Sequence, residues 1–117
     1  MKKKTNHKAL ADSKYHLKAL RFNKGKTKWS LVHFKSLEPL VDVLTFGAQK
    51  YGEFNWMKGL NKKEILESLS RHLFALMDGE ENDKESGLPH ISHIQANAMF
   101  YTYFSQQQKS KKLKKKT

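Results

Sequence analysis

The first regular pattern of apolar and polar positions lies between residues 37 and 49. Apolar side chains recur there at i, i+3, i+4 and i+7, which is the spacing of one face of a helix. Ser36 precedes the pattern and is a residue type that commonly caps a helix. Pro39 falls in the first turn, where proline is tolerated because the backbone N–H groups lack helical partners. We predict a helix over 37–49, preceded by an extended lead-in at Trp29–Phe34.

Two further helical patterns follow, separated by a short acidic loop. The second helix is expected to begin after Asn61, with Glu64 completing a capping box, and to end at Gly79. The third is expected to start at Pro89 and to continue to about Gln107. A connection of about ten residues favours an antiparallel hairpin. No stretch alternates as a strand does, so the prediction is a small all-α domain with a central helical hairpin.

Charge divides the chain into three parts. Residues 1–28 hold ten basic residues and one acid, and residues 109–117 hold six lysines and no acid, whereas residues 29–108 carry a net charge of −3. A folded nucleic-acid-binding module carries its basic residues on the folded surface. Here the net charge of +12 comes from the two ends of the chain, so it says little about what the middle part binds. We predict a flexible basic segment over 1–28, a helical domain over 29–107 and a disordered basic tail over 108–117.

Composition excludes several classes of protein. The chain has no cysteine, which rules out disulfides and thiolate metal sites. No apolar run reaches the roughly 18–20 residues that span a bilayer, and no apolar segment of a signal peptide follows the basic start, so a cytoplasmic protein is expected. The core of so short a chain is modest, and association into a homo-oligomer would help to stabilise it.

Acidic residues and histidines crowd the stretch 79–93. Acids at the end of a helix are unfavourable unless a cation lies near them, and carboxylates at Glu80 and Asp83 suit a hard cation such as Mg²⁺ or Mn²⁺. The alternative is a solvated acidic loop, which spacing alone favours. His90 and His93 share one face of the third helix with Asn97.

His72 lies on the second helix and, taken alone, is readily explained as a core histidine. In an antiparallel hairpin, however, it approaches His90 and His93 where the two helices meet the loop. Neutral imidazoles ligate metals, charged ones stabilise phosphates, and the start of a helix favours an anion. The combination is moderately specific for metal-assisted phosphate chemistry.

The connection at 47–56 is a second candidate region. Lys50 can meet a phosphate, Asn55 can bond to a base edge or a water, and Trp56 or Tyr51 can stack on a base. The alternative is that these aromatic rings only cover the core. Glu64 and Glu67 form an ExxE pair, and twelve residues later Glu80 and Asp83 form an ExxD pair. This spacing resembles the carboxylate signature of helical nucleotide pyrophosphohydrolases. Because helix capping already explains Glu64, we do not assign the first pair to a metal.

Several motifs occur together in an order that resembles a known family: WSLV (29–32), LEPLV (37–41), FGAQKY (46–51), NW (55–56), RH (71–72) and GEENDKESGLPHISH (79–93). They resemble the N-terminal domain of phage dATP/dGTP diphosphohydrolases, which belongs with the MazG-like all-α pyrophosphohydrolases. The resemblance covers roughly residues 29–104. It implies divalent-cation-dependent hydrolysis of purine deoxynucleoside triphosphates to monophosphate and pyrophosphate, acting on the nucleotide pool of a phage-infected cell.

The same resemblance suggests roles for individual residues. It implies a metal and catalytic set in which Glu80 and Asp83 hold the metal and four residues act in catalysis: His72, Glu85, His90 and His93. It implies a substrate side formed by Lys50, Asn55 and Trp56. Two other functions stay open: a small basic phage accessory protein that binds nucleic acid weakly through its tails, and a family member that binds nucleotide without hydrolysing it.

Overall fold

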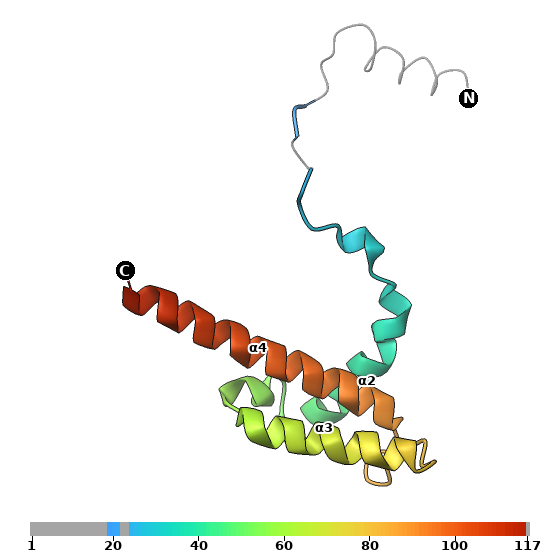
Figure 1. Ribbon diagram of the computed structural model, residues 1–117. Helices are drawn as coiled ribbons and strands as arrows, with labels where there is room; N and C mark the ends of the chain where they lie inside the picture. The colour runs from blue at the N-terminus through green and yellow to red at the C-terminus, as the bar shows by residue number, and fades with distance from the viewer. Residues whose placement is uncertain (1–18, 22–23, 117) are drawn as a thin grey trace, which may run out of the picture. The chain divides into compact units, whose positions relative to one another are not determined.

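The computed structural model describes residues 19–21 and 24–116 (Figure 1). The described residues up to Val32 form one unit, and those from His33 onward form a second, compact unit. In the first unit the described residues include one short 3₁₀ turn, η2 (Trp29–Leu31). Residues 1–18 and 22–23 of the predicted flexible segment lie outside the described residues. All candidate functional residues belong to the second unit.

The second unit is built from helices. In chain order they are η3 (Phe34–Leu37), α2 (Glu38–Tyr51), η4 (Asn55–Lys58), α3 (Lys62–Met77) and α4 (His90–Lys116). The described residues contain no strand, only an isolated bridge between Asn82 and Pro89 inside the acidic loop (Figure 1). The predicted all-α class is therefore confirmed. None of the helices over the described residues is long and apolar enough to span a membrane.

The start of α2 differs from the prediction. Ser36 does not cap the helix, because Phe34–Leu37 already curl into η3 and run directly into α2. The cap position is Leu37, which makes no side-chain capping bond. The expected extended lead-in at Trp29–Phe34 is also wrong, since 3₁₀ turns occupy most of that stretch. Pro39 does lie in the first turn of α2, as expected.

Both ends of α3 form as the sequence predicts. The Asn61 side chain accepts hydrogen bonds from the N–H groups of Lys63 and Glu64, at 2.8 and 3.2 Å. At the other end Gly79 adopts a φ of 96°, and its N–H and that of Glu80 bond back to the last turn of α3. This left-handed stop, which glycine permits without a steric penalty, turns the chain into the acidic loop.

The far end of α4 is the clearest correction. The helix starts at His90, one residue after the predicted start at Pro89, and it continues to Lys116 instead of ending near Gln107. Residues 108–116 are therefore helical rather than a disordered tail. No glycine or proline follows residue 89 to end the helix, and lysine and glutamine are good helix formers. The Gln108 side chain also accepts a hydrogen bond from the Lys62 side chain, at 3.2 Å.

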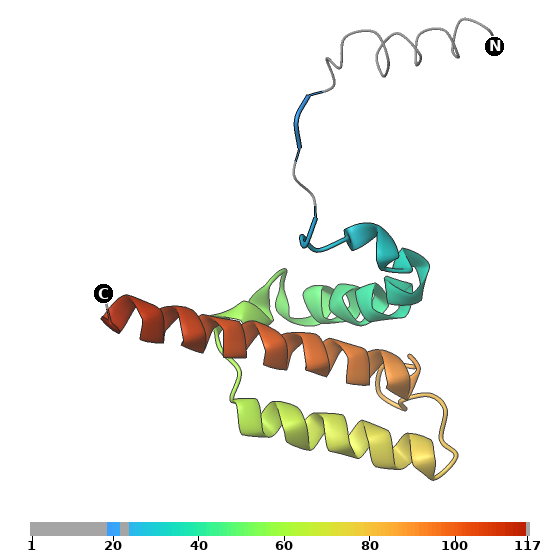
Figure 2. The same ribbon diagram turned by 45° about the horizontal axis from the view of Figure 1, so that its top comes forward.

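α4 is the central helix of the unit, with α2 and α3 packed against it (Figure 2). Cross-contacts show that α3 and α4 are antiparallel: Lys62 lies over the Tyr101 ring, Asn97 donates to Ser68, and His72 stacks on His93. The predicted hairpin is thus confirmed. The apolar side chains buried in the described core are Val43, Ile65 and Ala96, one from each helix.

Candidate active site

Three histidines and one aspartate meet where α3 and α4 join the acidic loop. The Nδ1 atoms of His72 and His90 are 2.8 Å apart, and the rings of His72 and His93 are stacked with centroids 4.4 Å apart. Asp83 reaches the same place from the loop, with Oδ2 3.9 Å from the His93 Nε2. His90 is buried, whereas the other three are half-buried. The hairpin thus joins residues up to 21 positions apart into one cluster.

The acidic loop holds Asp83 in a fixed orientation. Its carboxylate accepts hydrogen bonds from the N–H and the hydroxyl of Ser86, at 2.9 and 3.0 Å. The Ser86 Oγ also lies 2.7 Å from the His93 Nε2 and accepts a bond from the Leu88 N–H. The loop is closed by the bond from the His90 N–H to the Glu81 carbonyl. Sequence reasoning missed Ser86, although an aspartate three residues before a serine is a common turn-forming pattern.

The ionisation of these groups follows from burial and from their neighbours. Burial lowers the pKa of His72, and the nearby His93 and His90 add to the effect. Burial also lowers the pKa of His93, although Asp83 opposes this shift. For Asp83, burial alone would raise the pKa, but the two hydrogen bonds from Ser86 and the neighbouring histidines outweigh it and leave the pKa lowered. At neutral pH the cluster therefore holds a carboxylate and neutral imidazoles at His72 and His93.

Glu80 lies beside the cluster, next to the Nε2 atom of His90. Its Oε1 is 3.5 Å from the His90 Nε2, too long for a normal hydrogen bond, and that nitrogen has no hydrogen-bond partner. One of the two Nδ1 atoms of His72 and His90 donates a proton to the other. If the neutral His90 ring is the acceptor, its Nε2 carries a proton that faces the Glu80 carboxylate; if it is the donor, its Nε2 carries a lone pair instead.

Lys50 and Glu85 form the next feature outward from the cluster. The Lys50 Nζ donates to the Glu85 carboxylate at 2.7 Å, which ties the end of α2 to the acidic loop. This hydrogen bond is the main reason that the pKa of Lys50 is raised. The Glu85 side chain is 71 % exposed and belongs to this ion pair, not to the histidine cluster.

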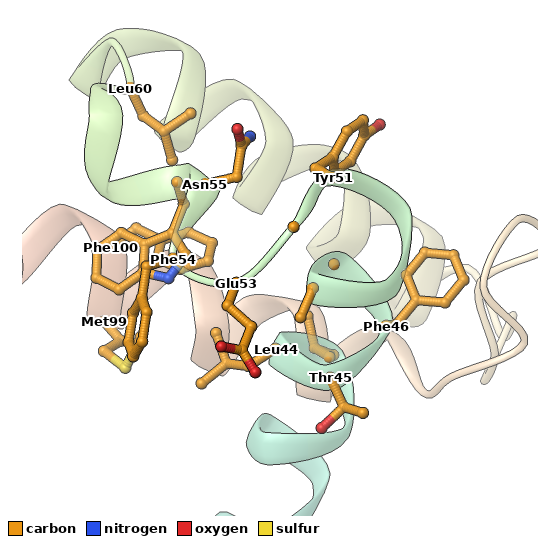
Figure 3. Close-up of a pocket in the computed structure, with 15 residues that line it drawn as sticks. Leu44, Thr45, Phe46, Tyr51, Glu53, Phe54, Asn55, Leu60, Met99 and Phe100 are labelled. Atoms are coloured by element: carbon orange, nitrogen blue, oxygen red, sulfur yellow. The ribbon is translucent and has the colours of Figure 1, made fainter.

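Beyond Lys50 a cavity of about 950 Å³ opens between α2, η4 and α4 (Figure 3). Asn55 and Trp56 line it, so two of the three predicted substrate residues lie here and not at the histidines. Trp56 also packs on Phe100, Tyr103 and Phe104 of α4, with ring centroids 4.7 to 6.2 Å apart. Its indole therefore serves the core as well as the cavity wall.

One set of side chains among the described residues is arranged to hold a metal ion. One donor atom each from His72, Asp83 and His90 lies within 4.8 Å of the others. This set shares Asp83 with the predicted pair but differs from it because Glu80 is not included and two imidazoles take part. Two imidazoles with one carboxylate are typical ligands of a transition metal, whereas Mg²⁺ takes mainly oxygen ligands.

Comparison with known proteins relates the chain to nucleotide-hydrolysing enzymes. A family model described as dATP/dGTP diphosphohydrolase, N-terminal, matches residues 16–114. A dATP/dGTP diphosphohydrolase of Salmonella phage PMBT28 is 36 % identical over 81 residues, which are 69 % of this chain and 28 % of that protein. The chain thus spans little more than a quarter of that relative's length. No solved structure matches.

Proposed function

Because the chain belongs to the family of dATP/dGTP diphosphohydrolase N-terminal domains, we propose that it hydrolyses purine deoxynucleoside triphosphates to the monophosphate and pyrophosphate. The activity would act on the cytoplasmic deoxynucleotide pool. The observation that carries this proposal is the convergence of His72, His90, His93 and Asp83 at one end of the hairpin, on a loop whose Glu85 pairs with Lys50. A basic group next to a carboxylate and neutral imidazoles suits a phosphate chain and its cation.

The side chains fit a divalent cation, and Mn²⁺ better than Mg²⁺. His72, Asp83 and His90 would hold the ion, since each offers a donor atom to a common point. The lowered pKa of His72 and that of Asp83 keep both in the ligating form at neutral pH. When bound, the ion would neutralise phosphate charge and lower the pKa of a coordinated water.

His93 is the side chain best suited to act as general base. Its lowered pKa leaves the imidazole neutral at pH 7. Because the Ser86 hydroxyl donates to Asp83, the His93 Nε2–H donates to the Ser86 Oγ and leaves Nδ1 as the basic nitrogen. In the proposed reaction the oxygen of a water bonds to the α-phosphorus, and the water's proton passes to His93. The bond from that phosphorus to the oxygen bridging the α- and β-phosphates breaks, and pyrophosphate leaves.

Lys50 is placed to receive the phosphate chain, with Glu85 as the partner that orients it. Its ammonium pairs with Glu85, whose charge acts on His93. It also lies 5.9 and 5.2 Å from the centroids of the Phe46 and Tyr51 rings, two rings that line the cavity. A nucleotide whose phosphates meet Lys50 would direct its sugar and base toward that cavity. Asn55 would then meet the sugar or base through its amide.

A hydrolysis assay tests the proposal directly. The chain is incubated with dGTP or dATP and with Mn²⁺ or Mg²⁺, and pyrophosphate release is measured beside a chelated control. We expect turnover that is faster with Mn²⁺ and is absent in the chelator. The His93→Gln variant should lose at least about 100-fold in kcat with little change in KM, as expected for loss of a general base. Absence of turnover in protein that shows a helical circular dichroism spectrum would refute the proposed activity.

A further inference from the structure

The two ring nitrogens of His90 have different surroundings. The residue is 4 % exposed, and its Nδ1 lies 2.8 Å from the His72 Nδ1, so this nitrogen faces another of the proposed metal ligands. Its Nε2 is buried without a hydrogen-bond partner, and the Glu80 Oε1 lies 3.5 Å from it. A buried polar atom without a partner is costly, so Nε2 is the atom of this ring that still needs one.

The backbone holds Glu80 and His90 next to each other at the two ends of the acidic loop. The Glu80 N–H donates to the Ala75 carbonyl at 2.9 Å, which fixes the start of the loop against the last turn of α3. The His90 N–H donates to the Glu81 carbonyl at 2.9 Å, which brings the start of α4 back to the same point. The Glu80 side chain is 39 % exposed, and a small rotation about its own bonds completes the hydrogen bond to Nε2.

The nearby carboxylate determines which nitrogen of the His90 ring carries the proton. An ionised carboxylate accepts hydrogen bonds and cannot donate them. If the His90 Nε2 carried a lone pair, that lone pair would face the negative oxygen of Glu80 where water does not reach the nitrogen. A proton on Nε2 turns the same contact into a hydrogen bond to a charged acceptor, which is the stronger kind. The neutral ring then has its lone pair on Nδ1.

We infer that Glu80 is a positioning residue that keeps the His90 proton on Nε2 and the Nδ1 lone pair directed into the cluster. His72 then donates its Nδ1–H to the His90 Nδ1, so the hydrogen bonds run in one direction from His72 through His90 to Glu80. This role replaces the role of metal ligand that the sequence resemblance implies for Glu80. The inference rests on the proposed function, because the lone pair is presented to the cation of that reaction.

The two roles of Glu80 predict different behaviour of the metal-free chain. A metal ligand acts only when the ion is bound, whereas a positioning residue fixes the tautomer of His90 before any ion arrives. A carboxylate that holds the second nitrogen of a ligating histidine orients the ring, and its loss typically costs about 10- to 100-fold in metal affinity. The tautomer of His90 without metal is therefore the measurement that separates the two roles.

Nitrogen NMR of the imidazole rings, recorded on the full chain in a chelator at pH 8, reads the tautomers directly. The His90 signals are assigned by their loss in His90→Gln. We expect wild-type His90 to carry its proton on Nε2 and His72 to carry its proton on Nδ1. Glu80→Leu removes the acceptor, and Glu80→Gln replaces it with an amide that can accept or donate. Both variants should therefore show a mixture of His90 tautomers.

Calorimetric titration with Mn²⁺ measures the effect of the fixed tautomer on the affinity for the ion. We expect Glu80→Leu to weaken Mn²⁺ binding about 10- to 100-fold and Glu80→Gln to weaken it less. Glu81→Gln is the matched control, because it removes the same charge from the next, exposed position and keeps the carbonyl that bonds to His90. It should keep the His90 tautomer and most of the affinity. If circular dichroism shows that Glu80→Leu does not fold, the milder Glu80→Gln carries the comparison.

Four results would each overturn the inference: a wild-type His90 without a proton on Nε2, an unchanged tautomer in the Glu80 variants, no Mn²⁺ binding to the wild type, or an equal loss of affinity in Glu81→Gln. Turnover of dGTP by the same preparations is a separate readout. A fixed tautomer and a Glu80-dependent Mn²⁺ affinity without turnover would refute the proposed function and leave the role of Glu80 standing. Turnover with a mixture of tautomers in the wild type would refute the role of Glu80 and leave the proposed function standing.

Discussion

The imidazole rings of His72 on α3 and His93 on α4 lie face to face, with planes 3° apart. Two charged imidazolium rings in that position would repel each other, so the stack belongs to the neutral state of the pair. The lowered pKa of each ring agrees with this. At this end α3 and α4 thus meet through two imidazole rings that are neutral at pH 7.

Acid should therefore weaken the fold of the metal-free chain. The folded pKa values of His72 and His93 lie below the ordinary 6.5, so the unfolded chain takes up these protons first. The free energy of unfolding should be constant above about pH 7 and fall as the pH drops below 6.5 through the folded values. The lowered pKa of Asp83 adds a second loss below pH 3.8. Denaturant titrations in a chelator from pH 8 to pH 5 measure the first loss.

A variant with glutamine at both His72 and His93 is the control for that titration. It should show a flatter dependence of stability on pH in the same interval. A wild-type chain that becomes more stable on acidification would contradict the assigned direction of the two shifts.

Ser86 should behave as a positioning residue. Its hydroxyl touches Asp83 and His93 at 3.0 and 2.7 Å. Removal of this hydroxyl in Ser86→Ala leaves Asp83 and His93 without that hydrogen-bond partner, which should lower the free energy of unfolding by about 1–2 kcal/mol. It should also lower kcat with little effect on KM. Ser86→Thr keeps the hydroxyl and should recover most of kcat. Ser110→Ala, at an exposed position of α4, serves as the neutral control; a loss of kcat there equal to that of Ser86→Ala would disprove a specific role.

Substitutions of Lys50 and of Glu85 should have opposite effects on KM, although the two residues form one ion pair. Lys50→Gln removes the cation that meets the phosphates, so KM should rise about tenfold, with a smaller change in kcat. Glu85→Gln frees the ammonium for the substrate, so KM should stay the same or fall. A large loss of kcat in Glu85→Gln would instead support the catalytic role that the sequence resemblance implies for it.

Substitution of Phe54 by asparagine should stabilise the fold and weaken nucleotide binding. Phe54 lines the cavity and has a φ of 56°. Asparagine tolerates the left-handed region far better than phenylalanine, and the ring is mostly exposed. Phe54→Asn should therefore raise the free energy of unfolding by about 0.5–1 kcal/mol and weaken nucleotide binding several-fold. Thermal unfolding and calorimetry on the same sample check both. A loss of stability would show that the ring contributes to packing more than to ligand contact.

The exposed apolar side of α3 predicts association with a second copy of the chain. Its large side chains lie at i, i+7, i+8 and i+11 and are 38 to 74 % exposed: Leu66, Leu73, Phe74 and Met77. The described core buries three apolar side chains, which is little for a unit of this length. We expect a dimer by light scattering, and a monomer after Phe74→Glu and Met77→Glu together. Arg71→Glu, on the polar side of α3, should leave the mass unchanged, and a monomeric wild type would contradict the expectation.

Local signals predicted much of the fold. Asn61 and Gly79 mark the two ends of α3 because each makes its bond within a few residues, and the start of α4 at His90 follows from Pro89 in the same way. The end of α4 was not predictable from charge: repulsion among lysines suggested a disordered tail, but helix propensity and the contact of Gln108 with Lys62 favour the helix.

The histidine cluster was predictable once a hairpin was assumed, because an antiparallel pair brings His72 to His90 and His93. The binding of Glu85 to Lys50, in contrast, depends on how α2 crosses α4, and no local pattern encodes that crossing. Glu53 and Phe54 lie inside the candidate region 47–56, but no local pattern singles them out. Their relation to the cavity depends on three separate elements and on one backbone angle.

The continuity of α4 sets a length requirement for the substrate. The same helix carries His93 in its first turns and Met99, a wall of the cavity, six residues later, which is about 9 Å along the axis. No loop lies between these two points, so motion of a loop cannot change their separation. In the proposed function, a nucleotide whose base lies in the cavity has to cover at least this axial distance with its phosphate chain to reach the histidines. A nucleotide with a shorter phosphate chain is then expected to bind in the cavity without being hydrolysed.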